Sequence, residues 1–291
     1  MHIHRDRKAR TITLHQQPKI EKLLSDARLI PEDKKCISKV SKIPASPDII
    51  LSHDQCPKDK DDPNAVDRTL FQSFVGMLLY IAITARPDLS TAVSSVARFS
   101  HNPGKAHWRA VLMILRYLQG TIRMRFQLGG TSKYPELRAY VDSDWAGDKS
   151  RKSRTGFVIF LCGALVIWSS KLQKCVALSS TEAEYVAVTA AARFVIWARQ
   201  FLQELGFEQP ESTIICEDNK GCIDIAISSK AHPAIKHIDI RHHFIRERVQ
   251  EIKDIKLEKV STEVMVADLF TKQLPFPVFK RHRDKLQLLH N

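Results

Sequence analysis

Four acidic residues stand at positions where a chain can build a metal-binding or catalytic site. Asp142 and Asp218 each end an apolar run typical of a buried strand, Glu184 lies in the first turn of a long predicted helix, and Asp268 follows the last predicted strand. Carboxylates that converge on one point raise one another's pKa, which a protein tolerates when divalent cations neutralise them. Carboxylate oxygens are hard ligands, so the expected ion is Mg²⁺ or Mn²⁺ rather than Zn²⁺.

Each of these acids also has a structural interpretation. Asp and Glu are common at strand ends and in the first turns of helices, where they accept hydrogen bonds from free backbone N–H groups. Taken singly, each would more often be structural than catalytic. The hypothesis of a site therefore depends on the elements that bring the four together.

The second half of the chain supplies suitable elements. Strands are predicted over 137–142, 156–161, 164–169, 212–216 and 255–260, with a hairpin turn at Cys162-Gly163. A long helix begins near Ser179, where two pairs of residues have capping-box spacing, and ends at Gly206. Further helices are expected from 219, over 237–251 and over 265–273. This order predicts an α/β domain with a mixed five-stranded sheet and flanking helices, in which the first and fourth strands can be neighbours.

The long helix carries an apolar stripe that we expect to face the core. Its members are Ala183, Ala187, Ala190, Phe194, Trp197, Phe201 and Leu205. We also expect Trp145, Trp168 and Trp197 to be core residues rather than platforms for stacked bases. His232, His237, His242 and His243 lack cysteines at ligand spacing, which favours helix packing over zinc binding.

The first half predicts a mostly helical unit. Three stretches of helical apolar spacing fill residues 70–120, separated by Arg86-Pro87-Asp88 and Asn102-Pro103-Gly104. Before them, regularly spaced prolines leave one helix at 18–29 and a loose connector. The composition changes after residue 132, so we place the domain boundary between residues 135 and 136, giving domains 1–135 and 136–291.

Composition indicates the kind of partner. The 291 residues include 45 Lys and Arg against 32 Asp and Glu, a formal net charge of +13, which favours a polyanion: nucleic acid first, an anionic membrane surface second. No convincing basic amphipathic helix supports the membrane. Six cysteines without a CxxC pair, and the absence of a secretory signal or a spanning apolar run, predict an intracellular protein with reduced thiols.

Several ordered motifs resemble the ribonuclease H domain of copia-type retrotransposon polyproteins. They are Ala139–Asp148, Ser153–Phe157, Ala177–Tyr185, Cys216–Asn219, Lys236–Arg241 and Val266–Lys272. Upstream, Ser73–Tyr80, Arg86–Asp88 and Leu115–Thr121 resemble the C-terminal part of the reverse transcriptase of the same elements. The resemblance implies a ribonuclease H-like domain at 136–291, preceded by a small, mostly helical reverse-transcriptase remnant at 1–135.

The resemblance also selects among neighbouring acids. Glu184, followed by Tyr185-Val186-Ala187, fits the helix glutamate of the superfamily, whereas Glu182 does not. Asp142 is the first acid after its apolar run and Asp144 is the adjacent alternative. Asp218 is preferred to Glu217, which strand alternation would turn to the opposite face. Asp268 matches the last aspartate of the family.

The activity that the resemblance implies is hydrolysis of the RNA strand of RNA–DNA hybrids with two Mg²⁺ or Mn²⁺ ions, held by Asp142, Glu184, Asp218 and Asp268. The basic residues Lys149, Arg151, Lys152 and Arg154 are candidates to contact phosphates of the hybrid, with a solvated turn as the alternative. No small-molecule cofactor and no polymerase activity are expected, and a polymerase-containing Pol chain is a possible partner. The alternative function is an inactive retroelement fragment that at most binds nucleic acid.

Overall fold

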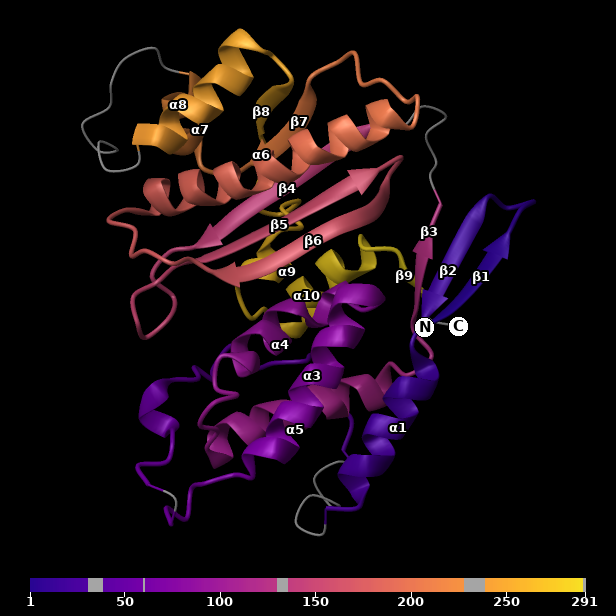
Figure 1. The fold of residues 1–291 in the computed structure, drawn as a ribbon, viewed down its shortest axis with the longest axis vertical. Coiled ribbons are helices and arrows are strands. Elements are labelled where there is room, and N and C mark those ends of the chain that lie inside the picture. The colour runs from indigo at the N-terminus through magenta and orange to yellow at the C-terminus, as the bar shows by residue number, and fades with distance from the viewer. Residues whose placement is uncertain (31–38, 60, 130–135, 228–238, 290–291) are drawn as a thin grey trace. The chain divides into compact units, whose positions relative to one another are not determined.

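The computed structural model describes residues 1–30, 39–59, 61–129, 136–227 and 239–289 (Figure 1). The chain divides into two compact units, one formed by Met1–Gln127 with Gln273–Asn291 and the other by Leu128–Lys272. The chain first passes from one unit to the other between Gln127 and Leu128, close to the boundary proposed at 135. Residues 130–135 lie outside the described ranges. Residues 273–291, which the sequence groups with the second domain, belong to the first unit.

Helices make up most of the first unit. They are α1 (Gln17–Arg28), α3 (Arg68–Thr84), α4 (Ser90–Ala97), α5 (Lys105–Gly120) and α10 (Phe276–Asp284), with short 3₁₀ turns η1 (His53–Gln55) and η2 (Pro87–Leu89). The three helices predicted between 70 and 120 are confirmed. Between the first two, Arg86 pairs with Asp88 at 2.8 Å with both side chains buried, and the Tyr117 hydroxyl donates to Asp88 at 2.7 Å.

The first unit also contains a sheet that the sequence does not predict. Its order is β1 (His2–Asp6), β2 (Thr11–His15), β3 (Arg125–Leu128) and β9 (Leu288–Leu289). Every residue of β1 is exposed, and β9 is two residues long. Neither strand buries one apolar face, so neither shows the alternation by which strands are recognised.

The second unit contains the predicted mixed five-stranded sheet with flanking helices, which confirms the α/β fold class. The strand order is β6 (Ala164–Leu172), β5 (Arg154–Leu161), β4 (Leu137–Asp144), β7 (Thr213–Glu217) and β8 (Ile255–Lys259). Strands β4, β5 and β6 are antiparallel, while β7 runs parallel to both β4 and β8. The first and fourth strands of the prediction are therefore neighbours.

The helices of this unit are α6 (Ser180–Glu204), α7 (Lys220–Ile227), α8 (Asp239–Arg246) with a π-helical turn at Glu247–Glu251, and α9 (Asp268–Thr271). The start of the helix predicted at 237–251 lies outside the described residues, as do His232 and His237. His242 is buried and its ring centroid lies 6.1 Å from that of Tyr185.

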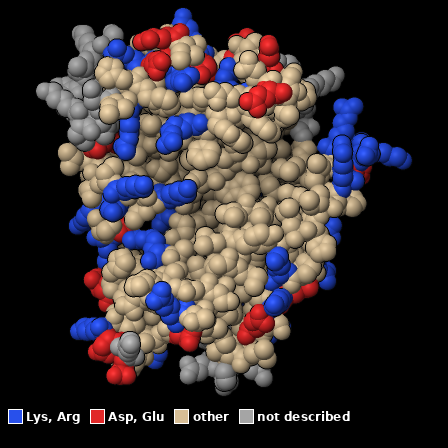
Figure 2. Space-filling view, viewed as in Figure 1, with Lys and Arg blue, Asp and Glu red and all other residues tan. Residues whose placement is uncertain are grey.

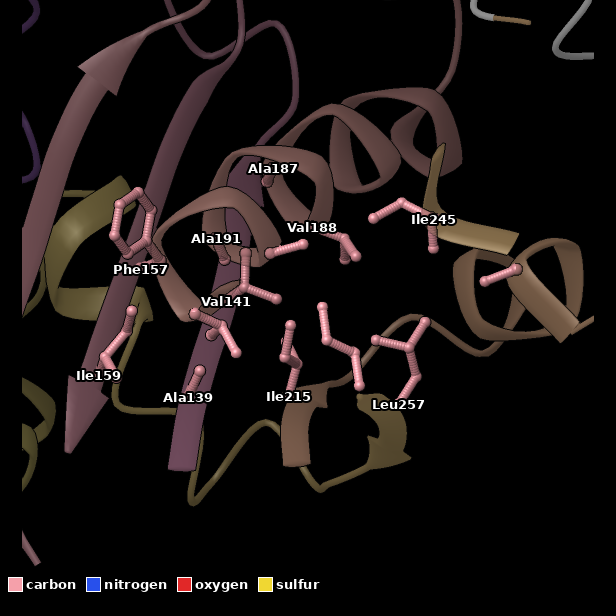
Figure 3. Close-up of a cluster of buried hydrophobic side chains, with 14 of the residues drawn as sticks. Ala139, Val141, Phe157, Ile159, Ala187, Val188, Ala191, Ile215, Ile245 and Leu257 are labelled. Carbon is pink, nitrogen blue, oxygen red and sulfur yellow. The ribbon is translucent and has the colours of Figure 1, made fainter. Parts of the chain in front are cut away.

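The core of this unit lies between the sheet and α6 (Figure 3). Val141 and Ile215 project from β4 and β7 toward Ala187, Val188 and Ala191 of the helix. The small alanines allow α6 to approach the strands closely, and the core of the unit extends to Ile245 of α8 and Leu257 of β8.

The predicted apolar stripe of α6 is right at its start and wrong further along. Ala183 and Ala187 are buried, but Phe194, Trp197, Phe201 and Leu205 are all exposed. Val195, Ala198 and Leu202 face the core in their place. Predicting Trp145 and Trp197 as core residues is also wrong, since their side chains are 48% and 54% exposed. Beyond Ala190 the prediction continued onto large aromatic residues, whereas the face packed on the sheet continues mainly through alanine and valine.

Candidate active site

Parallel pairing of β4 with β7 brings two of the predicted acids to one edge of the sheet. Tyr140 lies opposite Cys216 in the register, so Asp142 and Asp218, each two residues further along, leave the sheet at the same end. The hydroxyl of Thr262 donates to Asp218 at 2.8 Å. Carboxyl ends of neighbouring parallel strands are where α/β sheets place their ligands.

The start of α6 supplies the third acid. The side chain of Ser179 accepts from the backbone N–H of Glu182 at 3.1 Å, and the Glu182 carboxylate accepts from the backbone N–H of Leu178 at 2.6 Å. This pair of bonds engages Glu182 in capping the helix. Glu184, one half-turn further, is the acid that lies against Asp142 and Asp218.

These three acids form a compact group. One carboxylate oxygen from each of Asp142, Glu184 and Asp218 lies within 4.8 Å of the other two, and within the described ranges no other group of His, Cys, Asp or Glu side chains is arranged in this way. Asp142 and Glu184 are buried and Asp218 is half-buried. Three hard oxygens this close match the ligand set of a divalent cation.

The electrostatics of Glu184 support a cation here. Burial, followed by the charges of Glu217, Asp142 and Asp218, raises its pKa to about 11. Its Oε2 atom is buried and accepts no hydrogen bond. A metal ion would satisfy this oxygen and remove the repulsion, so the residues present fit the group.

Glu217 belongs to the same acidic region. It is fully buried, and its charge is the largest charged contribution raising the pKa of Glu184. Glu217 is the last residue of β7, where its Oε1 accepts from the backbone N–H of Asn219 at 3.0 Å. Glu217 still pairs with Lys259 of β8 and follows the core residue Ile215 by two positions, so strand alternation places it on the face of β7 toward α6.

Asp268 lies beside the triad, on α9. It is buried, and burial followed by the Asp142 charge raises its pKa to about 7. The Lys272 ammonium lies 2.9 Å from Asp268 Oδ1 and 3.7 Å from Asp142 Oδ2. The Thr271 hydroxyl donates to Asp142 Oδ2.

The sequence analysis did not predict that Thr271 and Lys272 contact Asp142, although both lie in the motif that contains Asp268. They follow Asp268 by three and four residues, the spacing that places side chains on one face of a helix. That spacing predicts that both side chains lie beside Asp268 and can reach the same acids.

Gly156 allows α9 to approach the sheet. It lies opposite Asp142 in the pairing of β4 with β5. A Cβ atom on Gly156 would lie 2.6 Å from Thr271 Cγ2 and 2.8 Å from the backbone carbon of Phe270. The absence of a side chain at this position therefore sets how closely Asp268 and Thr271 can approach Asp142.

The predicted basic segment divides in two. Lys149 and Arg151 are exposed and Lys152 is half-buried. Arg154, in contrast, is buried on β5 opposite Asp144, with its guanidinium 3.4 Å from the Ser170 hydroxyl. Its charge acts against the burial that raises the pKa of Asp144. Arg154 thus lacks the exposed position expected for a phosphate contact.

Comparison with known proteins places this architecture in a family. The sequence is 42% identical over 276 residues to the Retrovirus-related Pol polyprotein from transposon TNT 1-94 of Nicotiana tabacum, covering 94% of this chain and 20% of that protein. It is 39% identical over 223 residues to the corresponding polyprotein from transposon RE1 of Arabidopsis thaliana, covering 76% of this chain and 15% of that protein.

No protein-family model matches the sequence. Among solved structures, LC11-RNase H1 in complex with an RNA/DNA hybrid aligns with 47% of this chain and 94% of its own, at 15% identity and a TM-score of 0.36. None of the described helices is both long enough and apolar enough to cross a membrane. The chain spans about a fifth or less of the length of the curated relatives named above. On their identity over most of its length, the chain belongs to the retrovirus-related Pol polyproteins of copia-type transposons.

Proposed function

We propose that the second unit hydrolyses the RNA strand of RNA–DNA hybrids in a reaction that requires Mg²⁺ or Mn²⁺. The observation that carries this proposal is the convergence of Asp142, Glu184 and Asp218 within 4.8 Å at the carboxyl ends of two parallel strands. Membership of the transposon Pol family supports a role in processing nucleic acid, and the net charge of +13 favours a polyanionic substrate.

In this proposal Asp142, Glu184 and Asp218 hold the metal, with Asp268 adjoining them. A bound divalent ion supplies an activated water and neutralises charge on the leaving oxygen. The contribution of the chain is to fix its ligands: Thr271 orients Asp142, Thr262 orients Asp218, and packing of α6 on the sheet fixes Glu184. Ligands fixed in this way need no reorganisation when the substrate binds.

Substrate selection follows from the same chemistry. The 2′-hydroxyl is what distinguishes an RNA strand from DNA, so we assign discrimination to contacts in the minor groove of the hybrid. Lys149, Arg151 and Lys152 are positioned on the surface to neutralise phosphates. These contacts orient the hybrid without reading its sequence.

The test is cleavage of a hybrid labelled on its RNA strand, in Mg²⁺, by the full chain and by Asp142→Asn. Asp142→Asn removes one carboxylate from the proposed metal ligands, which costs several kcal/mol of transition-state stabilisation. We therefore expect a cleavage rate at least about a hundredfold lower. Asp224→Asn, at an exposed acid of α7, is the matched control and should cut like the unchanged chain.

Two outcomes contradict the proposal: a folded chain that cuts no hybrid in Mg²⁺ or Mn²⁺, or an Asp142→Asn variant that cuts as fast as the unchanged chain. A folded chain that binds the hybrid without cutting it would identify the alternative, a retroelement fragment without catalysis.

A further inference from the structure

A cation of the chain itself, the ammonium of Lys272, lies at the site. Its Nζ atom lies 2.9 Å from Asp268 Oδ1 and 3.7 Å from Asp142 Oδ2. The two aspartate side chains are only 5% and 4% exposed, whereas the lysine side chain is 38% exposed. The ammonium therefore reaches inward from the surface to contact two buried carboxylates.

Asp142 lies between two groups of acidic side chains. On one side Asp142, Glu184 and Asp218 lie within 4.8 Å of one another, and Asp268 is not a member of this group. On the other side Asp142 and Asp268 share Lys272. Asp142 is common to both sides, as expected of a carboxylate placed between two positive charges.

The two sides also differ in how far their charge is compensated. Glu184 Oε2 is buried and accepts no hydrogen bond, and the charges that act most strongly on Glu184 are all negative. On the other side, Asp142 and Asp268 face the Lys272 ammonium.

We propose that Lys272 occupies the place of a second cation in the free protein, so that one divalent ion binds on the Asp142–Glu184–Asp218 side and a second binds only when Lys272 leaves Asp142 and Asp268. This inference rests on the proposed function for the identity of the site as a divalent-metal site. A lysine suits the role because its charge is compact and its stem is flexible enough to leave. The side-chain exposure of 38% gives it room to do so.

The experiment counts bound ions without measuring cleavage. Mn²⁺ is titrated into the full chain in the absence of nucleic acid, and free Mn²⁺ is followed by electron paramagnetic resonance. We expect one tightly bound ion in the unchanged chain. In Lys272→Gln a second ion should bind at least about tenfold more tightly than it does in the unchanged chain, since one opposing charge within about 4 Å is removed.

Three further variants keep the test decisive. Lys256→Gln, at an exposed lysine of β8, should bind Mn²⁺ like the unchanged chain. Lys272→Arg retains the charge and should also bind one ion tightly, which can be measured even if Lys272→Gln does not fold. Adding Asp268→Asn to Lys272→Gln should abolish the tighter second site.

The proposal is overturned if the unchanged chain or Lys272→Arg binds two ions with equal affinity, or if a folded Lys272→Gln binds as the unchanged chain does. Failure of the proposed function would look different: the ion counts would follow the expectation while no hybrid is cut.

Discussion

Asp142 is the residue on which the contacts of the site converge. It is buried, it accepts from Thr271, it lies 3.7 Å from the Lys272 ammonium, and it shares a 4.8 Å group with Glu184 and Asp218. The partners come from three regions of the fold: Thr271 and Lys272 from the end of α9, Glu184 from α6, and Asp218 from the end of β7. A change at any of them alters the position or charge of this one carboxylate, so their effects on activity should not add independently.

The acids predict how the stability of the metal-free protein depends on pH. Burial and Asp142 raise the pKa of Asp268 to about 7, above the value of about 4 of a free carboxyl group. Between these values the folded state binds more protons than the unfolded state, so stability falls as the pH rises through that window. Urea unfolding in EDTA should show a lower free energy of unfolding at pH 8 than at pH 5, by on the order of 1 kcal/mol or more.

The variant Asp268→Asn, which cannot ionise, should reduce that decline, and Asp224→Asn should leave it unchanged. Adding Mg²⁺ at pH 8 should restore part of the stability because the cation favours the ionised acids. A metal-free protein that is more stable at pH 8 than at pH 5 would show that ionisation of the buried acids does not destabilise the fold.

At the residue scale, the sequence identified the acids better than their surroundings. Asp142 and Asp218 could be proposed because they end apolar strands. Glu184 was chosen over Glu182 by the resemblance to the family, since both acids have capping-box spacing, and only the structure shows Glu182 engaged in capping. The burial of Arg154 could not be found, because it depends on the pairing of β5 with β4, which places Arg154 opposite Asp144. The apolar pattern does not encode that pairing.

At the scale of elements, the distance between α9 and the sheet depends on the glycine at position 156. In Gly156→Ala the added Cβ would lie 2.6 Å from Thr271 Cγ2 and 2.8 Å from the Phe270 backbone, so α9 must shift. We expect a loss of about 1–3 kcal/mol in the free energy of unfolding together with a loss of cleavage. Chemical denaturation and the hybrid assay measure the two effects.

Gly76→Ala is the matched control, because nothing lies within 4 Å of a Cβ atom at this exposed position of α3. It should raise stability by up to about 1 kcal/mol through helix propensity, with cleavage unchanged. Equal effects of the two substitutions would refute the close approach at Gly156.

The turn between β4 and β5 carries the residues that we assign to phosphate binding. Replacing Lys149 and Arg151 by Gln should weaken hybrid binding in EDTA and lower the slope of log affinity against log salt by about 1 per residue. The fold should be retained, since both side chains are exposed. Arg154→Gln is the contrasting variant and should lower stability instead, because this side chain is buried beside Asp144. An unchanged salt slope in the double variant would show that this turn is a solvated loop.

Prediction of the elements succeeded where the apolar period was strong. Helices α3, α4 and α5 were found because Pro87 and Pro103 interrupt clear helical spacing, and β4 to β8 because their apolar runs are bounded by turns. The core face of α6 was found at Ala183 and Ala187 and lost further along, where the prediction followed the exposed aromatic residues. There the helix packs on the sheet through Val195, Ala198 and Leu202.

At the scale of the whole molecule, the chain carries 45 Lys and Arg against 32 Asp and Glu, a net charge of +13. On the face shown in Figure 2, Lys and Arg side chains lie in several separate places and not in a single band. The net charge favours general attraction to a polyanion, and we propose that the turn between β4 and β5 adds local phosphate contacts.

The return of residues 273–291 to the first unit has a mechanical consequence. Both ends of the chain belong to the first unit, and the second unit is inserted between Gln127 and Gln273. A force applied at Met1 and Asn291 acts on the first unit, and it reaches the second unit only after the first unit unfolds. In an optical trap the first unit should therefore unfold first, before the release of residues 128–272, about 500 Å of extended chain. Release of residues 128–272 before the first unit unfolds would contradict the assignment of the C-terminal residues to the first unit.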